Sequence, residues 1–187
     1  MRPGSYTELF FLDEAAALAA GHRPCAECRR PDYQAFQAAW RLVHPGAPAW
    51  ADAMDARLHS ERRARPWVKR TWTHLGQLAD LPDGTYVALD GRAWLVWRDR
   101  LFAWAADQYV DDRPRPPCGS VTVLTPPSLV GVLQAGYRPL VHPSASGLPG
   151  SARGRPSSFS RLLWPDTSPH RPGAIAHLGP GCYCGER

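Results

Sequence analysis

The feature that most constrains this chain is a change of apolar pattern near residue 80, from helical spacing to strand-like runs. The segment TYVALDGRAWLVW, residues 85–97, places Asp90-Gly91 between two apolar runs. This is a strong β-hairpin signal, because a type I′ turn needs positive φ at both central positions. The runs 101–105 and 120–124 predict two more strands. We therefore predict a small antiparallel sheet over residues 84–124.

The N-terminal part predicts one strand followed by helices. Residues 5–12, SYTELFFL, are rich in aromatic and β-favouring residues. Asp13 is placed to cap the helix EAAALAA, and Gly21 is placed to end it. Pro31 suits the first turn of the next helix, where a missing N–H costs nothing. That helix has one apolar face, formed by Tyr33, Phe36, Trp40 and Val43.

Two more helices are predicted. In residues 50–63, Met54 and Leu58 mark the apolar side. Ser128 is placed to cap a last helix, LVGVLQA, which ends at Gly136.

Two segments of the chain resemble each other. Residues 13–24 read DEAAALAAGHRP and residues 128–139 read SLVGVLQAGYRP, with cap, helix, Gly and Arg-Pro at the same spacing. We interpret them as two ordinary helix stops rather than a duplicated unit, because only the first is followed by cysteines.

These elements predict a single α+β domain over residues 1–143, in which the N-terminal strand and helices pack on the sheet. Residues 80–143 are its β-rich part. Twenty Pro and sixteen Gly argue against a helical bundle. From residue 144 to residue 187, Ser, Gly, Pro and Arg dominate. Such a segment cannot bury enough apolar surface to fold alone, so we predict a disordered C-terminal tail.

The net charge of +5 allows an anionic partner such as nucleic acid, without establishing one. Cations interleaved with aromatic rings suit phosphate contacts and base stacking. The alternative is a solvated helix end whose Trp residues belong to the core. The densest basic run, residues 60–72, carries Arg62, Arg63, Arg65, Lys69 and Arg70, with Trp67 and Trp72 among them.

Cys25 and Cys28 form a Cys-x-x-Cys pair in the turn between the first two helices. Two thiolates at this spacing can hold one Zn²⁺ from a single turn, and a tetrahedral site then needs two more ligands. The neighbouring Arg23, Arg29 and Arg30 would favour the thiolate form. Redox chemistry is a weaker interpretation, because the redox motif normally follows a strand rather than a helix. A third interpretation is a pair of small buried residues.

The stretch FFLDEAAALAAGHRPCAECRRPD resembles the second half of the metal-binding domain of the Ada family of bacterial DNA alkylation-repair proteins. In that family a strand leads to a short helix rich in Glu and Ala, then to Ala-Gly-Phe-Arg-Pro-Cys, two spacer residues and Cys. Here His22 replaces the Phe. The resemblance covers residues 10–32 and indicates a half zinc module over residues 5–45. Residues 5–143 also resemble an uncharacterised bacterial family, with LPDGTYVALDGRAWLVW as a recurring block.

The resemblance implies a Zn²⁺ held by four cysteines, two of them matching Cys25 and Cys28, in a module that contacts DNA. In the family, an upstream cysteine accepts a methyl group from a DNA phosphotriester. This chain has no cysteine before Cys25, so methyl transfer has no candidate nucleophile at the matching place. The other candidate ligands are Cys182 and Cys184, in GPGCYCGER, and the nearby His22.

The sequence thus favours a zinc-binding, DNA-associated module that lacks the methyl-acceptor cysteine. An enzyme acting on nucleic acid is the alternative, with an unassigned active site and Asp55–His59 as a candidate pair one helical turn apart. A metal-free protein with core cysteines is a further alternative. The predicted phosphate contacts of the favoured module are Arg23, Arg29, Arg30 and the basic residues of the 62–70 run.

The expected location follows from three observations. The sequence has no apolar stretch of about 18 residues, so we expect no membrane span. It shows no secretory signal, and its five cysteines are an odd number. Both favour the reducing cytoplasm.

Overall fold

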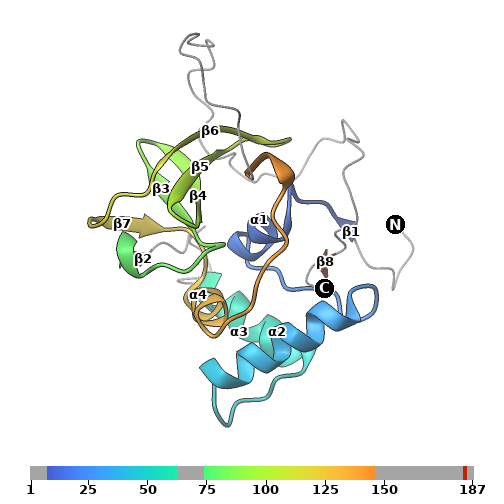
Figure 1. The fold of residues 1–187 in the computed structure, drawn as a ribbon. Helices are drawn as coiled ribbons and strands as arrows, with labels where there is room; N and C mark the ends of the chain where they lie inside the picture. Colours follow the sequence, from blue (N-terminus) through green and yellow to red (C-terminus); the bar gives the residue numbers. More distant parts are fainter. Residues whose placement is uncertain (1–7, 63–73, 146–182, 185–187) are drawn as a thin grey trace, which may run out of the picture.

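The structure, a computed structural model, describes residues 8–62, 74–145 and Tyr183–Cys184, the last two by their backbone alone. Figure 1 shows a sheet at one end of the molecule and α2 with α3 at the other. In chain order the described elements are β1 (Glu8–Leu9), α1 (Glu14–Ala19), α2 (Arg30–Val43), α3 (Ala51–Arg62), β2 (His74–Gln77), the 3-10 helix η1 (Leu78–Asp80), β3 (Tyr86–Leu89), β4 (Arg92–Trp97), β5 (Arg100–Trp104), β6 (Tyr109–Pro114), β7 (Ser120–Val123), α4 (Pro127–Gln134), the 3-10 helix η2 (Pro143–Ala145) and β8 (Tyr183–Cys184).

The larger sheet has six strands in the order β2-β7-β3-β4-β5-β6, and every neighbouring pair is antiparallel. The fold class is therefore α+β, as predicted. Asp90 and Gly91 join β3 to β4 with φ of 52° and 72°, which confirms the hairpin turn.

The sequence pattern does not predict two of these strands, β2 and β6. The β2 sequence, HLGQ, is short and contains a Gly, and the β6 sequence, YVDDRP, is charged and ends in Pro114. Both strands lie at the edges of the sheet. Charged residues and Pro are tolerated there, because one side of an edge strand needs no ladder partner.

Both faces of the sheet are buried, because successive residues of a strand point to opposite faces. On one face, strand residues such as Val87, Val96 and Leu101 pack with Leu78 of η1 and Val130 of α4. The other face packs against the start of α1 and is formed by Tyr86, Leu95, Phe102 and Tyr109, with Leu12 and Ala15. Neither β4 nor β5 therefore alternates between apolar and polar residues.

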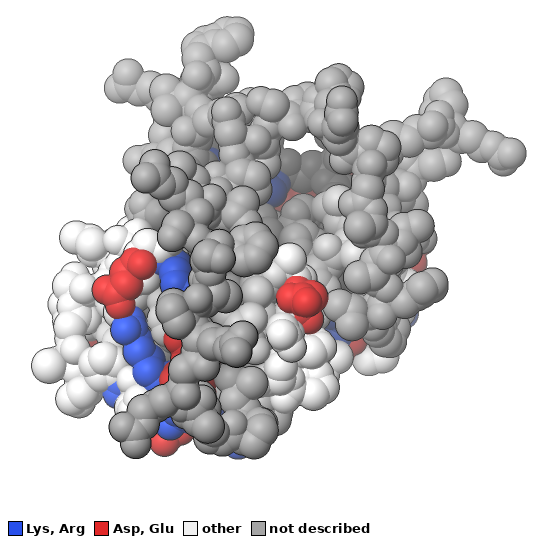
Figure 2. Space-filling view, turned by 90° about the horizontal axis from the view of Figure 1, so that it is seen from above, with Lys and Arg blue, Asp and Glu red and all other residues white. Residues whose placement is uncertain are grey.

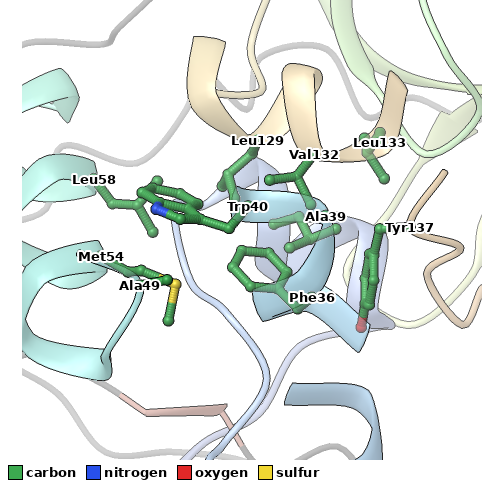
Figure 3. Close-up of a cluster of buried hydrophobic side chains, with 11 residues drawn as sticks. Phe36, Ala39, Trp40, Ala49, Met54, Leu58, Leu129, Val132, Leu133 and Tyr137 are labelled. Carbon is green, nitrogen blue, oxygen red and sulfur yellow. The ribbon is translucent and has the colours of Figure 1, made fainter. Parts of the chain in front are cut away.

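The helices form a core of their own (Figure 3). Phe36 and Trp40 of α2 are 0% and 1% exposed, which confirms the predicted apolar face of that helix. Tyr137, after α4, meets Phe36 edge-on with ring centroids 5.4 Å apart. The other buried members include Met54 and Leu58 of α3, as predicted, and Leu129, Val132 and Leu133 of α4.

The first helix begins and ends as predicted. The Asp13 carboxylate accepts a hydrogen bond from the Ala16 N–H at 2.8 Å and so caps α1. Gly21 has a φ of 80°, the left-handed conformation of a helix stop. Pro31 lies in the first turn of α2.

The predicted role of Ser128 is wrong. The residue before α4 is Pro126, which makes no side-chain cap, and Ser128 lies inside the first turn. The Pro126-Pro127 pair starts the helix two residues early, because the fixed φ of proline suits a first turn. The Ser128 hydroxyl instead donates to the carboxylate of Glu61 in α3.

The structure describes the two ends of the chain only in part. The strand expected over residues 5–12 is limited to Glu8–Leu9, and residues 5–7 lie outside the described part. Within the expected tail, Tyr183–Cys184 forms β8, which pairs antiparallel with β1. The rest of that segment, residues 146–182 and 185–187, lies outside the description. Within the described ranges, no helix is long and apolar enough to cross a membrane.

Candidate metal centre

The Cys-x-x-Cys pair lies in the turn that joins α1 to α2. The Arg29 N–H donates to the Cys25 carbonyl at 3.2 Å, so residues 25–29 form a single helical turn ahead of α2. Cys25 is 8% exposed, whereas Cys28 is exposed. The interpretation of both cysteines as core residues therefore fails for Cys28.

The buried carboxylate of Glu14, the first residue of α1, anchors this turn. Glu14 is 1% exposed, and its Oε2 lies 3.2 Å from Nη2 of the buried Arg29. Arg29 Nη2 also lies 2.9 Å from Oδ2 of Asp32. Glu14 further accepts hydrogen bonds from the Tyr137 hydroxyl and, at 2.8 Å, from the Leu140 N–H. With several donors directed at one carboxylate, the network holds a single geometry.

The Tyr137 hydroxyl remains a donor at neutral pH. Burial is the main cause that raises the pKa of Tyr137, and the negative charge of Glu14 adds to it. The phenol therefore stays protonated and can satisfy one oxygen of the carboxylate.

A second buried arginine ties the turn to α3. Arg23 is 3% exposed, and its Nε and Nη2 donate to the two oxygens of Asp55, each at 2.7 Å. Its Nη1 donates to the Pro24 carbonyl at 3.1 Å, and its guanidinium lies 5.4 Å from the centroid of the Tyr33 ring. Such a bidentate pair fixes orientation as well as distance.

These contacts change the predicted set of phosphate-binding residues. The guanidinium groups of Arg23 and Arg29 are buried against carboxylates, so we correct their role to support of the turn. Arg30 is exposed, which its predicted role requires. Arg62 is half-buried, with its Nη1 3.5 Å from the Ala20 carbonyl oxygen. The rest of the basic set lies outside the described residues: Arg63, Arg65, Lys69 and Arg70.

The backbone of Cys184 is linked through β8 to the segment that precedes the turn. Cys184 pairs with Glu8 of β1. The chain after β1 reaches Phe11, whose ring centroid lies 5.1 Å from that of His22, just before the Cys-x-x-Cys turn. Strand pairing and this ring contact therefore hold the backbone of Cys184 to the segment that leads into the turn. Cys182 lies outside the described residues, and Cys184 is described by its backbone alone.

The donor chemistry of the two pairs fits zinc. In the described ranges, no three His, Cys, Asp or Glu side chains are grouped as a metal site. A thiolate buried at Cys25 is costly unless a cation compensates its charge, and Zn²⁺ does so in a four-thiolate site. Cys25 and Cys28, with Cys182 and Cys184, would supply that set.

The candidate catalytic pair gains no support from the contacts of Asp55. Both carboxylate oxygens of Asp55 accept hydrogen bonds from Arg23. The Asp55 carboxylate therefore takes part in holding the turn.

Two important residues of this site, Glu14 and Tyr137, are missing from the sequence prediction. They lie 123 positions apart, so no local pattern links them. One signal was present: the charged Glu14 stands in a helix otherwise made of Ala and Leu. A carboxylate on so apolar a helix indicates a buried partner.

The chain matches no protein-family model, no curated protein and no solved structure. The resemblance to the Ada family therefore stays a prediction.

Proposed function

We propose that this chain is a zinc-stabilised module that associates with DNA and lacks the methyl-acceptor cysteine of the Ada family. In this proposal Cys25, Cys28, Cys182 and Cys184 hold one structural Zn²⁺. The observation that carries the proposal is the pairing of β8 with β1, because it brings the strand of Cys184 to the segment before the Cys-x-x-Cys turn.

The metal would join the two ends of the folded unit. Strands β1 and β8 pair over two residues each, which is too short a ladder to be stable alone. A metal cross-link between the α1–α2 turn and β8 would supply the missing stabilisation, since structural zinc contributes directly to folding. The Glu14–Arg29 and Arg23–Asp55 pairs would present the turn in a fixed geometry.

The DNA part of the proposal rests on positive charge. Arg30 is exposed next to the turn, and the run from Arg62 to Arg70 is the densest basic segment of the chain. The described surface seen in Figure 2 carries Arg and acidic side chains side by side. We assign most of the phosphate contacts to the basic run, because its cations are interleaved with the aromatic rings of Trp67 and Trp72.

Zinc content of protein purified without chelator tests the metal site. We expect about one zinc per chain, the stoichiometry of a four-thiolate site. Cys25→Ser with Cys28→Ser should remove it, and so should Cys182→Ser with Cys184→Ser. The matched control is Cys118→Ser, an exposed cysteine in the β6–β7 connection, which should leave the zinc content unchanged. Wild-type protein without zinc would refute the metal site.

DNA binding is tested separately, by the salt dependence of affinity for a short duplex. Replacing Arg63, Arg65, Lys69 and Arg70 with Gln should weaken binding and flatten the salt slope, because each phosphate contact releases counterions. The control is Arg138→Gln, an exposed arginine distant in sequence from the run. A loss for Arg138→Gln about one quarter as large as that of the quadruple variant, in proportion to the charge removed, would show nonspecific attraction by net charge and would contradict the assigned interface.

A further inference from the structure

One side of α2 is exposed along the whole length of the helix. The exposed residues that define this side, which we call the α2 face, are Arg30, Gln34, Ala35, Ala38, Arg41 and Leu42. They recur at spacings of three and four positions, so they form one continuous face of the helix. The opposite face packs into the helical core through Phe36, Ala39 and Trp40. The α2 face therefore has no role in the packing of this core.

The charge of the α2 face is positive. Arg30 and Arg41 lie near its two ends, and both are exposed. The one acidic residue of α2, Asp32, stands four positions before Phe36 and so belongs to the opposite side of the helix. Its carboxylate also lies 2.9 Å from Nη2 of Arg29, which compensates its charge. A face with cations and no acid complements the phosphates that line a DNA groove.

The side chains of the α2 face fit the edges of base pairs. Arg can donate two hydrogen bonds to guanine, and Gln can pair in the same bidentate way with adenine. Gln34 and Arg41 stand about two turns apart along one side of the helix. Between them, Ala38 is small enough for the helix backbone to approach the bases closely.

The dimensions of α2 also fit. The helix has 14 residues and is therefore about 21 Å long. With side chains an α-helix is about 10–12 Å across, and the major groove of DNA is about 12 Å wide. Figure 1 shows α2 at the end of the molecule away from the sheet, so the sheet does not obstruct the approach of a duplex to this helix.

Printed contacts link the α2 face to the start of the basic run. Nη1 of Arg62, where the run begins, lies 3.5 Å from the Ala20 carbonyl oxygen, just ahead of the cysteine turn. Within that turn, Arg23 pairs with Asp55 of α3 at 2.7 Å, and its guanidinium lies 5.4 Å from the centroid of the Tyr33 ring in α2. These contacts hold the C-terminal part of α3, from which the basic run continues, to the N-terminal part of α2.

We propose that the α2 face enters the major groove of duplex DNA, where Gln34 and Arg41 contact base edges while the basic run contacts phosphates. This inference rests on the proposed association with DNA and adds sequence selectivity to it. Phosphate contacts position a protein on a duplex, whereas contacts to base edges specify the sequence. The full chain therefore prefers some duplex sequences over others.

The test selects duplexes from a randomised library with the full wild-type chain and then compares affinity for the selected sequence with affinity for a random duplex. We expect a preference of about tenfold or more. Gln34→Ala with Arg41→Lys keeps the net charge, so affinity for the random duplex should stay within about twofold. The preference should fall by about tenfold, because Lys and Ala cannot form the bidentate pairs.

The matched control makes the same two exchanges at exposed residues of another helix end, Gln134→Ala with Arg138→Lys, and should keep the wild-type preference. Ala38→Gln adds bulk to the α2 face without changing charge and should also reduce the preference. Its control is Ala56→Gln at an exposed position of α3, which should not. All of these side chains are exposed, so each variant should fold as the wild type does.

The outcomes separate this inference from the proposed function. A preference that survives the exchanges at residues 34 and 41, or that falls equally in the control, would overturn the role of the α2 face. Wild type that binds duplexes without any preference would overturn it too, while leaving the association with DNA intact. Wild type that binds no duplex at all would refute the association itself and the inference with it.

Discussion

The C-terminal ends of α1 and α4 have the same backbone conformation and the same hydrogen-bond pattern. After α1, the Gly21 N–H donates to the Leu18 carbonyl at 2.8 Å and the His22 N–H to the Ala17 carbonyl at 2.9 Å. After α4, the Gly136 N–H and the Tyr137 N–H make the same bonds at 3.1 and 3.2 Å. Both are Schellman stops with Gly in the left-handed conformation. The repeated sequence Ala-Gly-aromatic-Arg-Pro is therefore the local chemistry of a helix end.

The side chains that follow these two stops have different environments. Arg23 is buried and paired with Asp55, whereas Arg138 is exposed. Tyr137 and Leu140 reach back to Glu14, so the second stop packs on the start of the first helix. The local sequence therefore gives the two helix ends the same backbone conformation. Residues distant in sequence decide which side chains after each end are buried and what they contact.

Removal of the proposed zinc should produce the largest difference in stability between the two helix ends. We expect chelation to lower the free energy of unfolding by several kcal/mol, because zinc binding supplies about 10–16 kcal/mol in small zinc peptides. The larger core of this chain would retain part of its stability. Hydrogen exchange should speed up first at His22 and Arg29 and less at Gly136. Equal acceleration at both helix ends would contradict a metal located at the first one.

Glu14→Ala should have the next largest effect, because it leaves the buried Arg29 without its buried partner. Loss of one member of a buried ion pair costs about 3–5 kcal/mol. The matched control is Asp32→Ala, which removes the exposed partner of the same arginine and should cost less than about 1 kcal/mol. Urea denaturation compares the two variants, and equal costs would show that burial of the pair is unimportant.

The stability costs of Arg23→Ala, after α1, and Arg138→Ala, after α4, compare the two helix ends directly. Loss of a bidentate, charge-assisted pair should cost about 1.5–3 kcal/mol, limited because the remaining Asp55 is partly hydrated at 30% exposure. Arg138 is exposed, so its replacement should stay within about 0.5 kcal/mol. Thermal denaturation measures both, and a cost at Arg138 equal to that at Arg23 would remove the distinction between the two ends.

The sequence predicts those parts of the fold that depend on neighbouring residues. The Asp13 cap, the Gly21 and Gly136 stops, the β3–β4 turn and the apolar face of α2 all follow from local chemistry, and the structure confirms them. The edge strands β2 and β6 could not be predicted in this way. Their pairing depends on β7 and β5, and their own residues are poor strand formers.

The candidate site shows the same division. The Cys-x-x-Cys turn and its position between two helices follow from the sequence, but the burial of Arg23 and Arg29 does not. Their partners Asp55 and Glu14 lie 32 and 15 positions away. A basic residue beside a cysteine pair suggests an anion site by composition alone. Here each guanidinium pairs with a carboxylate of the chain itself, and only tertiary structure shows this.

The smallest expected effect compares the two glycines. Gly21 and Gly136 have φ of 80° and 102°, so Ala at either position enters the left-handed region at a cost of about 1–2 kcal/mol. A methyl group at Gly21 would also lie 2.7 Å from Arg62 Cδ, whereas one at Gly136 meets nothing within 4 Å. The Arg62 side chain has to shift to accept this methyl group, which disturbs its 3.5 Å contact with the Ala20 carbonyl oxygen. Gly21→Ala should therefore cost only a few tenths of a kcal/mol more than Gly136→Ala.

A double-mutant cycle with Arg62→Ala isolates that difference. If the contact with Arg62 is its cause, Gly21→Ala should cost the same as Gly136→Ala once Arg62 is truncated. If the cost of Gly21→Ala exceeds that of Gly136→Ala by more than about 1 kcal/mol, and the excess disappears when Arg62 is truncated, the Arg62 side chain is held rigidly against the end of α1. An excess that persists without Arg62 would instead locate the extra cost in the backbone around Gly21, which is buried where Gly136 is exposed.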